Sequence, residues 1–185
     1  MAAVRGFTLI ELMVAVTLGS FILAGVLTTN LQLMRSGVRI TQYAEMSAQI
    51  RRAIEQVGGD LESASAIKWN SVSDITLTVP TASGSTQQVT YAWTSATQSL
   101  FQVPGTDSTV TAGRVYLVRG IPAFADGTAG VTFVRFDRDG NAATTDLATK
   151  RIQVIMNVVR QANTAANSTD TAVSTGFILR NKPVS

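Results

Sequence analysis

An almost unbroken apolar run covers residues 7–27 of this chain of 185 residues. At roughly 20 residues it is long enough to cross a lipid bilayer as a helix, and it exceeds the roughly 7 to 15 apolar residues of a cleaved secretory signal. The run carries one charge, on Glu11. An acidic residue costs about 2.5 to 3.5 kcal/mol at the middle of a membrane helix and less near an end. This carboxylate therefore predicts a partner of opposite charge.

A short leader with a single cation, Met-Ala-Ala-Val-Arg-Gly, precedes the sequence Phe-Thr-Leu-Ile-Glu. This arrangement resembles the cleavage and methylation signal of type IV prepilins. The resemblance implies that a membrane-bound prepilin peptidase cuts between Gly6 and Phe7, and that the new terminal Phe7 is methylated. Because Gly6 has no side chain, it would let the peptidase approach the backbone closely.

Cleavage at this bond would create a cationic α-amine on Phe7, one helical turn from Glu11. Opposite charges attract strongly where water is scarce, so pairing is favoured over leaving either charge alone. The resemblance implies that Glu11 pairs with the Phe7 amine of a neighbouring subunit during filament assembly. Such a pair would set the axial register of one helix against the next.

Two other interpretations of the apolar run stay open. A generic signal-anchor helix accounts for the hydrophobicity but not for an acid at the fifth position after a glycine. A cleaved secretory signal is disfavoured because residues 20–26 offer no good A-x-A site. The distribution of cations does not orient the segment. The prepilin resemblance implies a single pass through the inner membrane, with the C-terminal head in the periplasm or on an extracellular filament.

Composition removes several kinds of chemistry. The sequence contains no Cys and no His, which excludes disulfides, thiolate nucleophiles, Ser-His triads and zinc-type sites. No G-x-S-x-G or S-x-x-K pattern supplies a nucleophile with a base. We therefore expect a protein that is not an enzyme and has no resident cofactor, with calcium as the one alternative considered below.

The charge pattern does not favour DNA as a partner. The formal net charge is +3, and the cations are spread along the chain with doublets at Arg51-Arg52 and Lys150-Arg151 but no dense run. A solvated surface explains this spacing at least as well as a nucleic-acid groove does.

A helical period continues beyond the apolar run. Apolar side chains recur there at three- and four-residue steps, with one five-residue gap, at Val38, Tyr43, Met46, Ile50, Ile54, Val57 and Leu61. We expect one helix over residues 7–61, ended by the loop signals that follow, with Gly58-Gly59 in its last turn. At 1.5 Å per residue such a helix is roughly 80 Å long, so part of it is expected to project beyond any globular core.

From residue 64 onward, short β-like runs alternate with turn residues. We expect strands at residues 75–79, 89–93, 100–103, 114–119, 131–136, 151–159 and 175–180, and a long polar loop at 161–174. Strands that follow strands without intervening helices favour an antiparallel sheet. The expected fold class is therefore α+β and pilin-like. Its long N-terminal helix, membrane-spanning in the first half and amphipathic in the second, packs on an antiparallel β-sheet head.

The expected organisation is a leader at residues 1–6, a transmembrane and assembly helix at 7–29, its amphipathic continuation at 30–63 and a β-rich head at 64–185. Residues 176–182 read Gly-Phe-Ile-Leu-Arg-Asn-Lys, which together with the chain length and the loop-rich sheet resembles W-type minor pilins and J-type pseudopilins.

The resemblance implies a structural subunit of a type IV pilus or type II secretion filament. Its partners would be other pilin or pseudopilin subunits, the prepilin peptidase and the inner membrane. An alternative is a filament-displayed binding module for DNA, a surface or a secreted substrate. A third hypothesis is an unprocessed, membrane-anchored β domain unrelated to filaments.

One loop carries oxygen ligands at alternate positions, and its candidate calcium ligands are Asp137, Asp139, Asn141 and the nearby Asp146. Calcium takes six to eight oxygens, which suits such spacing. The pattern departs from an EF-hand, because Gly140 is at the fourth position rather than the sixth and Ala148 stands where a glutamate is required. Asp139-Gly140 is also a strong turn dipeptide, as is Asp126-Gly127. A plain hairpin loop is thus the simpler interpretation and a calcium loop the alternative.

Five aromatic residues of the β-rich region could line a ligand-binding face, namely Trp69, Tyr91, Trp93, Tyr116 and Phe133. Aromatic residues in strands usually supply core volume, and only 6% of this chain is aromatic. We expect these five side chains to pack in the core.

Overall fold

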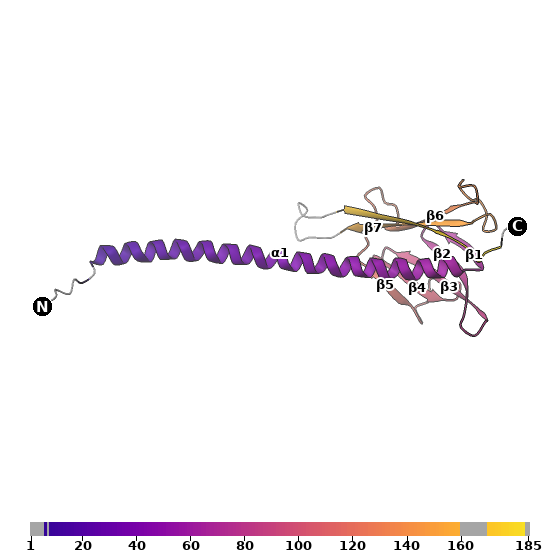
Figure 1. Cartoon of the computed structure of the whole chain (residues 1–185), viewed down its shortest axis with the longest axis horizontal. Coiled ribbons are helices and arrows are strands. Elements are labelled where there is room, and N and C mark those ends of the chain that lie inside the picture. The colour runs from indigo at the N-terminus through magenta and orange to yellow at the C-terminus, as the bar shows by residue number, and fades with distance from the viewer. Residues whose placement is uncertain (1–5, 7, 160–169, 184–185) are drawn as a thin grey trace. The chain divides into compact units, whose positions relative to one another are not determined.

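The computed structural model describes residue 6 and residues 8–159 and 170–183. Within these residues, one helix, α1 (Leu9–Ser63), is followed by eight strands (Figure 1). The strands are β1 (Ala66–Ser71), β2 (Asp74–Pro80), β3 (Thr86–Thr94), β4 (Ser99–Pro104), β5 (Val115–Arg119), β6 (Val131–Phe136), β7 (Arg151–Val159) and β8 (Asp170–Ile178). The chain divides into two compact units, Met1–Met46 and Ser47–Ser185.

In the first unit, α1 contains a candidate membrane span, Leu9–Gly37, with a mean hydropathy of 2.2 and no part buried within the protein. Five polar side chains of this span bond to carbonyls of their own helix: Thr17 to Val14, Ser20 to Val16, Thr28 to Ala24, Thr29 to Gly25 and Asn30 to Val26. A bilayer core offers no water to such groups, so internal bonding lowers the cost of placing them there. These features are consistent with membrane anchoring.

The second unit begins with the C-terminal part of α1. Ile50, Ala53, Val57 and Leu61 are buried, and their three- and four-residue spacing places them on one stripe of the helix. Three of these four, Ile50, Val57 and Leu61, belong to the predicted apolar stripe. This part of α1 therefore packs on the head of its own unit, as its periodicity predicts.

The strands form two antiparallel sheets rather than one. The first is a five-stranded meander in the order β1-β2-β3-β4-β5, and the second is a three-stranded sheet in the order β6-β7-β8. The chain leaves the first sheet at Gly120, where a φ of +75° favours glycine. Pro122 follows, and because it has no backbone N–H it cannot donate a hydrogen bond to a neighbouring strand. The α+β class and antiparallel pairing are confirmed, and the division into two sheets is a detail that the sequence pattern did not specify.

Two predictions about local structure in the head are corrected. Strand β1 was not predicted, because only Ile67 among its residues is buried and the sequence shows no clear alternation. Residues 170–174 were predicted as part of a polar loop, but β8 begins at Asp170, which pairs with Val159 of β7. Pairing with β7 supplies the backbone hydrogen bonds that hold this polar stretch as a strand. The rest of that predicted loop, residues 161–169, lies outside the described residues.

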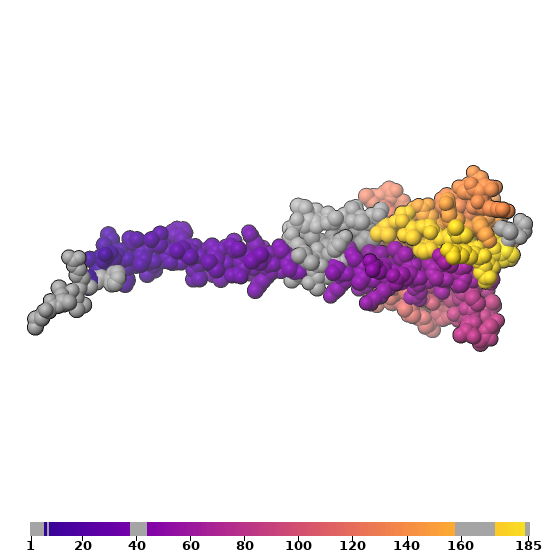
Figure 2. All heavy atoms as spheres, viewed as in Figure 1, coloured from indigo at the N-terminus to yellow at the C-terminus, as the bar shows by residue number. Residues whose placement is uncertain are grey.

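The C-terminal segment, residues 176–182, lies along α1 in the second unit, where Figure 2 shows β8 beside the helix. The Asn181 side-chain amide donates to the Ser63 carbonyl at 3.0 Å, and Arg180 lies 3.7 Å from Glu62. Lys182 is buried and donates to the Leu147 carbonyl at 2.5 Å. Burial, together with the positive charge of Lys150, holds the pKa of Lys182 below its usual range. This segment thus packs the end of the chain against α1 within the second unit.

Candidate functional site

The first candidate site lies where α1 begins. The backbone N–H and the hydroxyl of Thr8 both donate to Oε2 of Glu11, at 2.9 Å each, and the Glu11 N–H donates to the Thr8 hydroxyl at 3.3 Å. This reciprocal arrangement is a capping box, in which Thr8 is the N-cap and Glu11 the third helical residue. It satisfies backbone donors that the first turn leaves without helical partners.

The capping box leaves part of the Glu11 carboxylate available. Oε2 receives both bonds from Thr8, and no described residue donates to Oε1. Gly6 is exposed, with open space where a side chain would stand, whereas Phe7 lies outside the described residues. The T-x-x-E pattern of Thr8 and Glu11, at the start of the apolar run, is the sequence signal for this cap, which was not among the predictions.

The second candidate site is the loop between β6 and β7. Asp137 Oδ1 accepts from the backbone N–H groups of Asp139 and Asn141 at 2.9 and 2.8 Å, and Gly140 has a φ of +91°. Desolvation alone would raise the pKa of the Asp137 carboxyl, but hydrogen bonds from Asn141, Asp139 and Gly140 hold it below its usual range. The predicted Asp139-Gly140 turn is confirmed.

The Asp146 carboxylate holds together a polar network next to this loop. Its Oδ1 lies 2.9 Å from Nη1 of Arg135, and its Oδ2 accepts from the Trp69 backbone N–H at 3.2 Å. The Arg135 guanidinium also donates to the Thr144 carbonyl and lies 4.9 Å from the centre of the Trp69 ring. The described residues contain no group of three or more acidic side chains able to hold a metal ion. Calcium at Asp137, Asp139, Asn141 and Asp146 stays a prediction.

The five aromatic residues expected in the core have different environments. Tyr91 and Phe133 are buried, and Trp69 and Trp93 are half-buried. Tyr116 is 37% exposed, so the expectation that it packs in the core is wrong. It lies on β5, the terminal strand of the five-stranded sheet that the described residues form.

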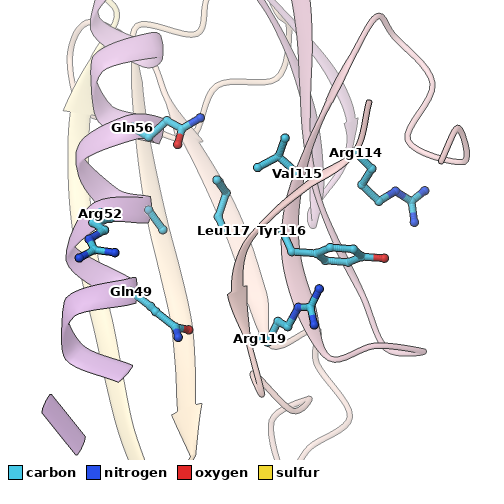
Figure 3. A pocket seen from close by; sticks show the side chains of 9 residues that line it. Gln49, Arg52, Gln56, Arg114, Val115, Tyr116, Leu117 and Arg119 are labelled. Carbon is cyan, nitrogen blue, oxygen red and sulfur yellow. The ribbon is translucent and has the colours of Figure 1, made fainter. Parts of the chain in front are cut away.

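A groove of about 700 Å³ runs between α1 and β5 in the second unit (Figure 3). Its lining comes from Gln49, Arg52, Ala53 and Gln56 of α1, and from Arg114, Val115, Tyr116, Leu117 and Arg119 of β5 and the residue before it. In Figure 3, the side chains of Val115 and Leu117 lie on the helix side of β5, whereas Tyr116 and Arg119 lie on its other side. Side chains from both faces of β5 therefore contribute to the lining of the groove.

The arginines around the groove are held by aromatic rings and carbonyls. The Arg114 guanidinium lies 4.1 Å from the centre of the Phe101 ring and donates to the carbonyls of Ser108 and Val110. The Arg119 guanidinium lies 4.6 Å from the centre of the Tyr116 ring. Among the described residues, no carboxylate lies within 4.0 Å of Arg52, Arg114 or Arg119. The sequence carries no local signal for this cationic groove, because its arginines are far apart along the chain.

Comparison with known proteins identifies the N-terminal region. Residues 1–27 match a family model described as the prokaryotic N-terminal methylation motif. No curated protein and no solved structure matches the chain. The motif indicates a type IV pilin-like precursor, a structural protein rather than a member of an enzyme family. It also implies processing by a prepilin peptidase and assembly with other pilins.

Proposed function

We propose that this chain is a minor pilin or pseudopilin, a structural subunit of a type IV pilus or a type II secretion filament. The observation that carries the proposal is the methylation motif at residues 1–27, which overlaps the apolar helical span Leu9–Gly37. The resemblance of residues 176–182 to W-type minor pilins and J-type pseudopilins supports the subtype. The inner membrane would hold the helix before assembly, with the head in the periplasm or on the filament.

In this proposal, cleavage between Gly6 and Phe7 frees a terminal amine that pairs with Glu11 of a neighbouring subunit. The capping box supports this role, because it orients the Glu11 carboxylate through Oε2 and leaves Oε1 without a donor among the described residues. An amine that reaches Oε1 would add a charge-assisted hydrogen bond in surroundings of low dielectric constant. Thr8 then positions the carboxylate, and Glu11 supplies the charge.

The first test is the intact mass and N-terminal sequence of the protein isolated from its native membrane. A mature chain that begins at methylated Phe7 is the expected result. A chain that retains the leader in cells with an active prepilin peptidase would overturn the proposal and favour a plain membrane anchor.

A second test separates the charge of Glu11 from its role in the cap. Glu11→Gln removes the charge but keeps a side chain that can complete a capping box, whereas Glu11→Ala removes both. Both variants are expected to insert and to be cleaved, but to assemble or co-purify poorly with other pilin subunits. Assembly by Glu11→Gln at the level of the unaltered chain would contradict the charge pairing.

The cationic groove favours a second candidate function, in which the filament displays the head as a binding module. The alternatives considered from the sequence were DNA, a surface or a secreted substrate. Three arginines without a carboxylate partner among the described residues favour a ligand that carries negative charge. DNA binding by this head would weaken steeply as salt rises, because counterions are released from phosphates.

A further inference from the structure

One edge of the five-stranded sheet is open at β5. In the strand order that the described residues form, β5 is terminal and pairs with β4 alone. Among the described residues, no backbone hydrogen bond joins β5 to anything outside its own sheet. The outer N–H and C=O groups of an edge strand form a template for an added strand. A polypeptide segment can therefore extend this sheet beside the groove.

The two faces of β5 differ in chemistry. Val115 pairs with Gln102 and Val118 with Leu100, whereas Tyr116 pairs with Phe101 and Arg119 with Ser99. Because paired residues share a face, Tyr116 and Arg119 lie together on one side of the sheet. Val115 and Leu117 lie on the other side, toward the helix, as Figure 3 shows. An added strand would thus meet a cationic, aromatic surface on one face, and on the other the apolar side chains of Val115 and Leu117, with polar residues of α1 across the groove.

The charges at this edge select the kind of strand that can be added. Arg119 is exposed beside Tyr116, and Arg114 lies on the Phe101 ring, whose edge contacts Tyr116 with ring centres 6.2 Å apart. An arginine that is already packed on an aromatic ring loses less conformational freedom on binding a carboxylate than a freely moving arginine does. No acidic side chain among the described residues lines the groove. The surface is therefore complementary to carboxylates.

We propose that an extended, acidic segment of a partner polypeptide binds along the outer edge of β5. Its backbone pairs with β5, its carboxylates face Arg119 and Arg114, and its alternate side chains lie in the groove between α1 and β5. Arg52 flanks the groove on the helix side. The preferred segment alternates acidic and apolar residues, because successive side chains of a strand point to opposite faces.

The same features disfavour two other occupants. A second copy of β5 would bring like-charged arginines together across the new pair, which is unfavourable. A nucleic acid could pair its phosphates with the arginines but could not form a backbone ladder with β5. The register of β5 against β4 shifts between Leu100 and Phe101, which limits the added ladder to a few residues. The charged contacts then supply much of the selectivity.

The test uses the full chain in non-ionic detergent and fluorescence anisotropy of a labelled peptide that alternates Glu and Val. Two further probes are a peptide of the same composition with Glu and Val in separate blocks, and a single-stranded oligonucleotide. We expect the alternating peptide to bind at least fivefold more tightly than the blocked peptide, and its affinity to fall as salt rises. Hydrogen exchange is expected to slow at the amides of β5 when this peptide binds.

Matched variants locate the site. Arg119→Glu, on the side that faces the carboxylates, is expected to weaken binding of the alternating peptide at least tenfold, and Arg52→Glu, on the helix side of the groove, is expected to weaken it by less. Arg138→Glu and Arg51→Glu change exposed arginines outside the groove and are expected to leave it unchanged. Three outcomes would each overturn the proposal. The first is an equal effect of the groove and control variants, and the second is no detectable peptide binding. The third is that the groove variants weaken binding of the oligonucleotide but not of the peptide. The proposal does not rest on filament assembly, since N-terminal processing is measured independently.

Discussion

The backbone of Gly58 in α1 lies directly against the ring of Phe177 in β8. A Cβ atom built on Gly58 would stand 3.0 Å or less from three atoms of that ring, whereas one built on the next residue, Gly59, would meet nothing within 4 Å. Adjacent glycines in the same helix thus have different roles. Gly58 permits close packing of the C-terminal strand, and Gly59 has no such contact.

Gly58→Ala is expected to destabilise the head by about 1 to 3 kcal/mol, because the added methyl group forces the Phe177 ring or the helix to shift. Gly59→Ala is expected to stabilise it by about 0.5 to 1 kcal/mol, since alanine is the better helix former and the site is open. Chemical denaturation of the full chain in detergent, followed by tryptophan fluorescence, measures both effects, because both tryptophans lie in the head. Equal effects of the two substitutions would contradict the packing role of Gly58.

A second contact ties α1 to the centre of the five-stranded sheet. The hydroxyl of Tyr91 donates to Oδ2 of Asp60 at 2.5 Å, and the tyrosine is fully buried. Tyr91→Phe leaves a carboxylate oxygen without this donor, so we expect a loss of about 1 to 3 kcal/mol in the free energy of unfolding. Tyr116→Phe removes a hydroxyl from an exposed ring and is the control, with an expected change within about 0.5 kcal/mol.

The same pair predicts a pH dependence. Burial, then the hydrogen bond and the negative charge of Asp60, raise the pKa of Tyr91 above its ordinary value of about 10. The folded state therefore keeps the phenolic proton at a pH where the unfolded chain has lost it. This contribution to stability is complete below about pH 10 and is lost as the pH rises further. Unfolding curves should show a steeper alkaline loss for the unaltered chain than for Tyr91→Phe, and parallel curves would exclude this linkage.

Asp146 is expected to stabilise the head through Arg135 and the Trp69 backbone. Asp146→Asn keeps the shape but removes the charge from a half-buried ion pair, so we expect a loss of about 1 to 2 kcal/mol. Asp139→Asn changes an exposed carboxylate of the adjacent turn and should alter stability by less than about 0.5 kcal/mol. Denaturation in calcium and in EDTA is expected to show the same loss for Asp146→Asn. A loss confined to calcium would instead assign Asp146 to a metal site.

Thr8 is expected to hold the start of α1. Thr8→Val removes the N-cap hydroxyl, which typically costs about 1 kcal/mol, so the amides of the first turn should exchange hydrogen faster. Thr17→Val, which removes a hydroxyl bonded to the Val14 carbonyl within the span, should leave that turn unchanged. Hydrogen exchange of the full chain in detergent provides the measurement. Unchanged exchange in Thr8→Val would show that the capping box contributes nothing to the helix start.

Much of the local structure was predictable from the sequence. The apolar run and its helical continuation predicted α1 to within two residues of its observed C-terminal end at Ser63. The strands β6 and β7 match their predicted bounds, because their residues alternate or are richly β-branched over a full strand length. The prediction of a prepilin-type N-terminus is confirmed by the methylation motif at residues 1–27, whereas the leader bounds 1–6 stay a prediction.

Contacts between distant segments decided the rest. Gly58 and Gly59 are the same residue type side by side, and only β8, more than a hundred residues later in the chain, distinguishes them. Arg52 and Arg119 likewise border one groove although neither position carries a local signal for it. The periodicity of apolar residues and the short motifs depend on residues that are close together along the chain, so they can be read from the sequence, as can the chain length. Division into two sheets, an open edge and a charged groove arise when separate segments pack together, and the tertiary structure alone decides which segments meet.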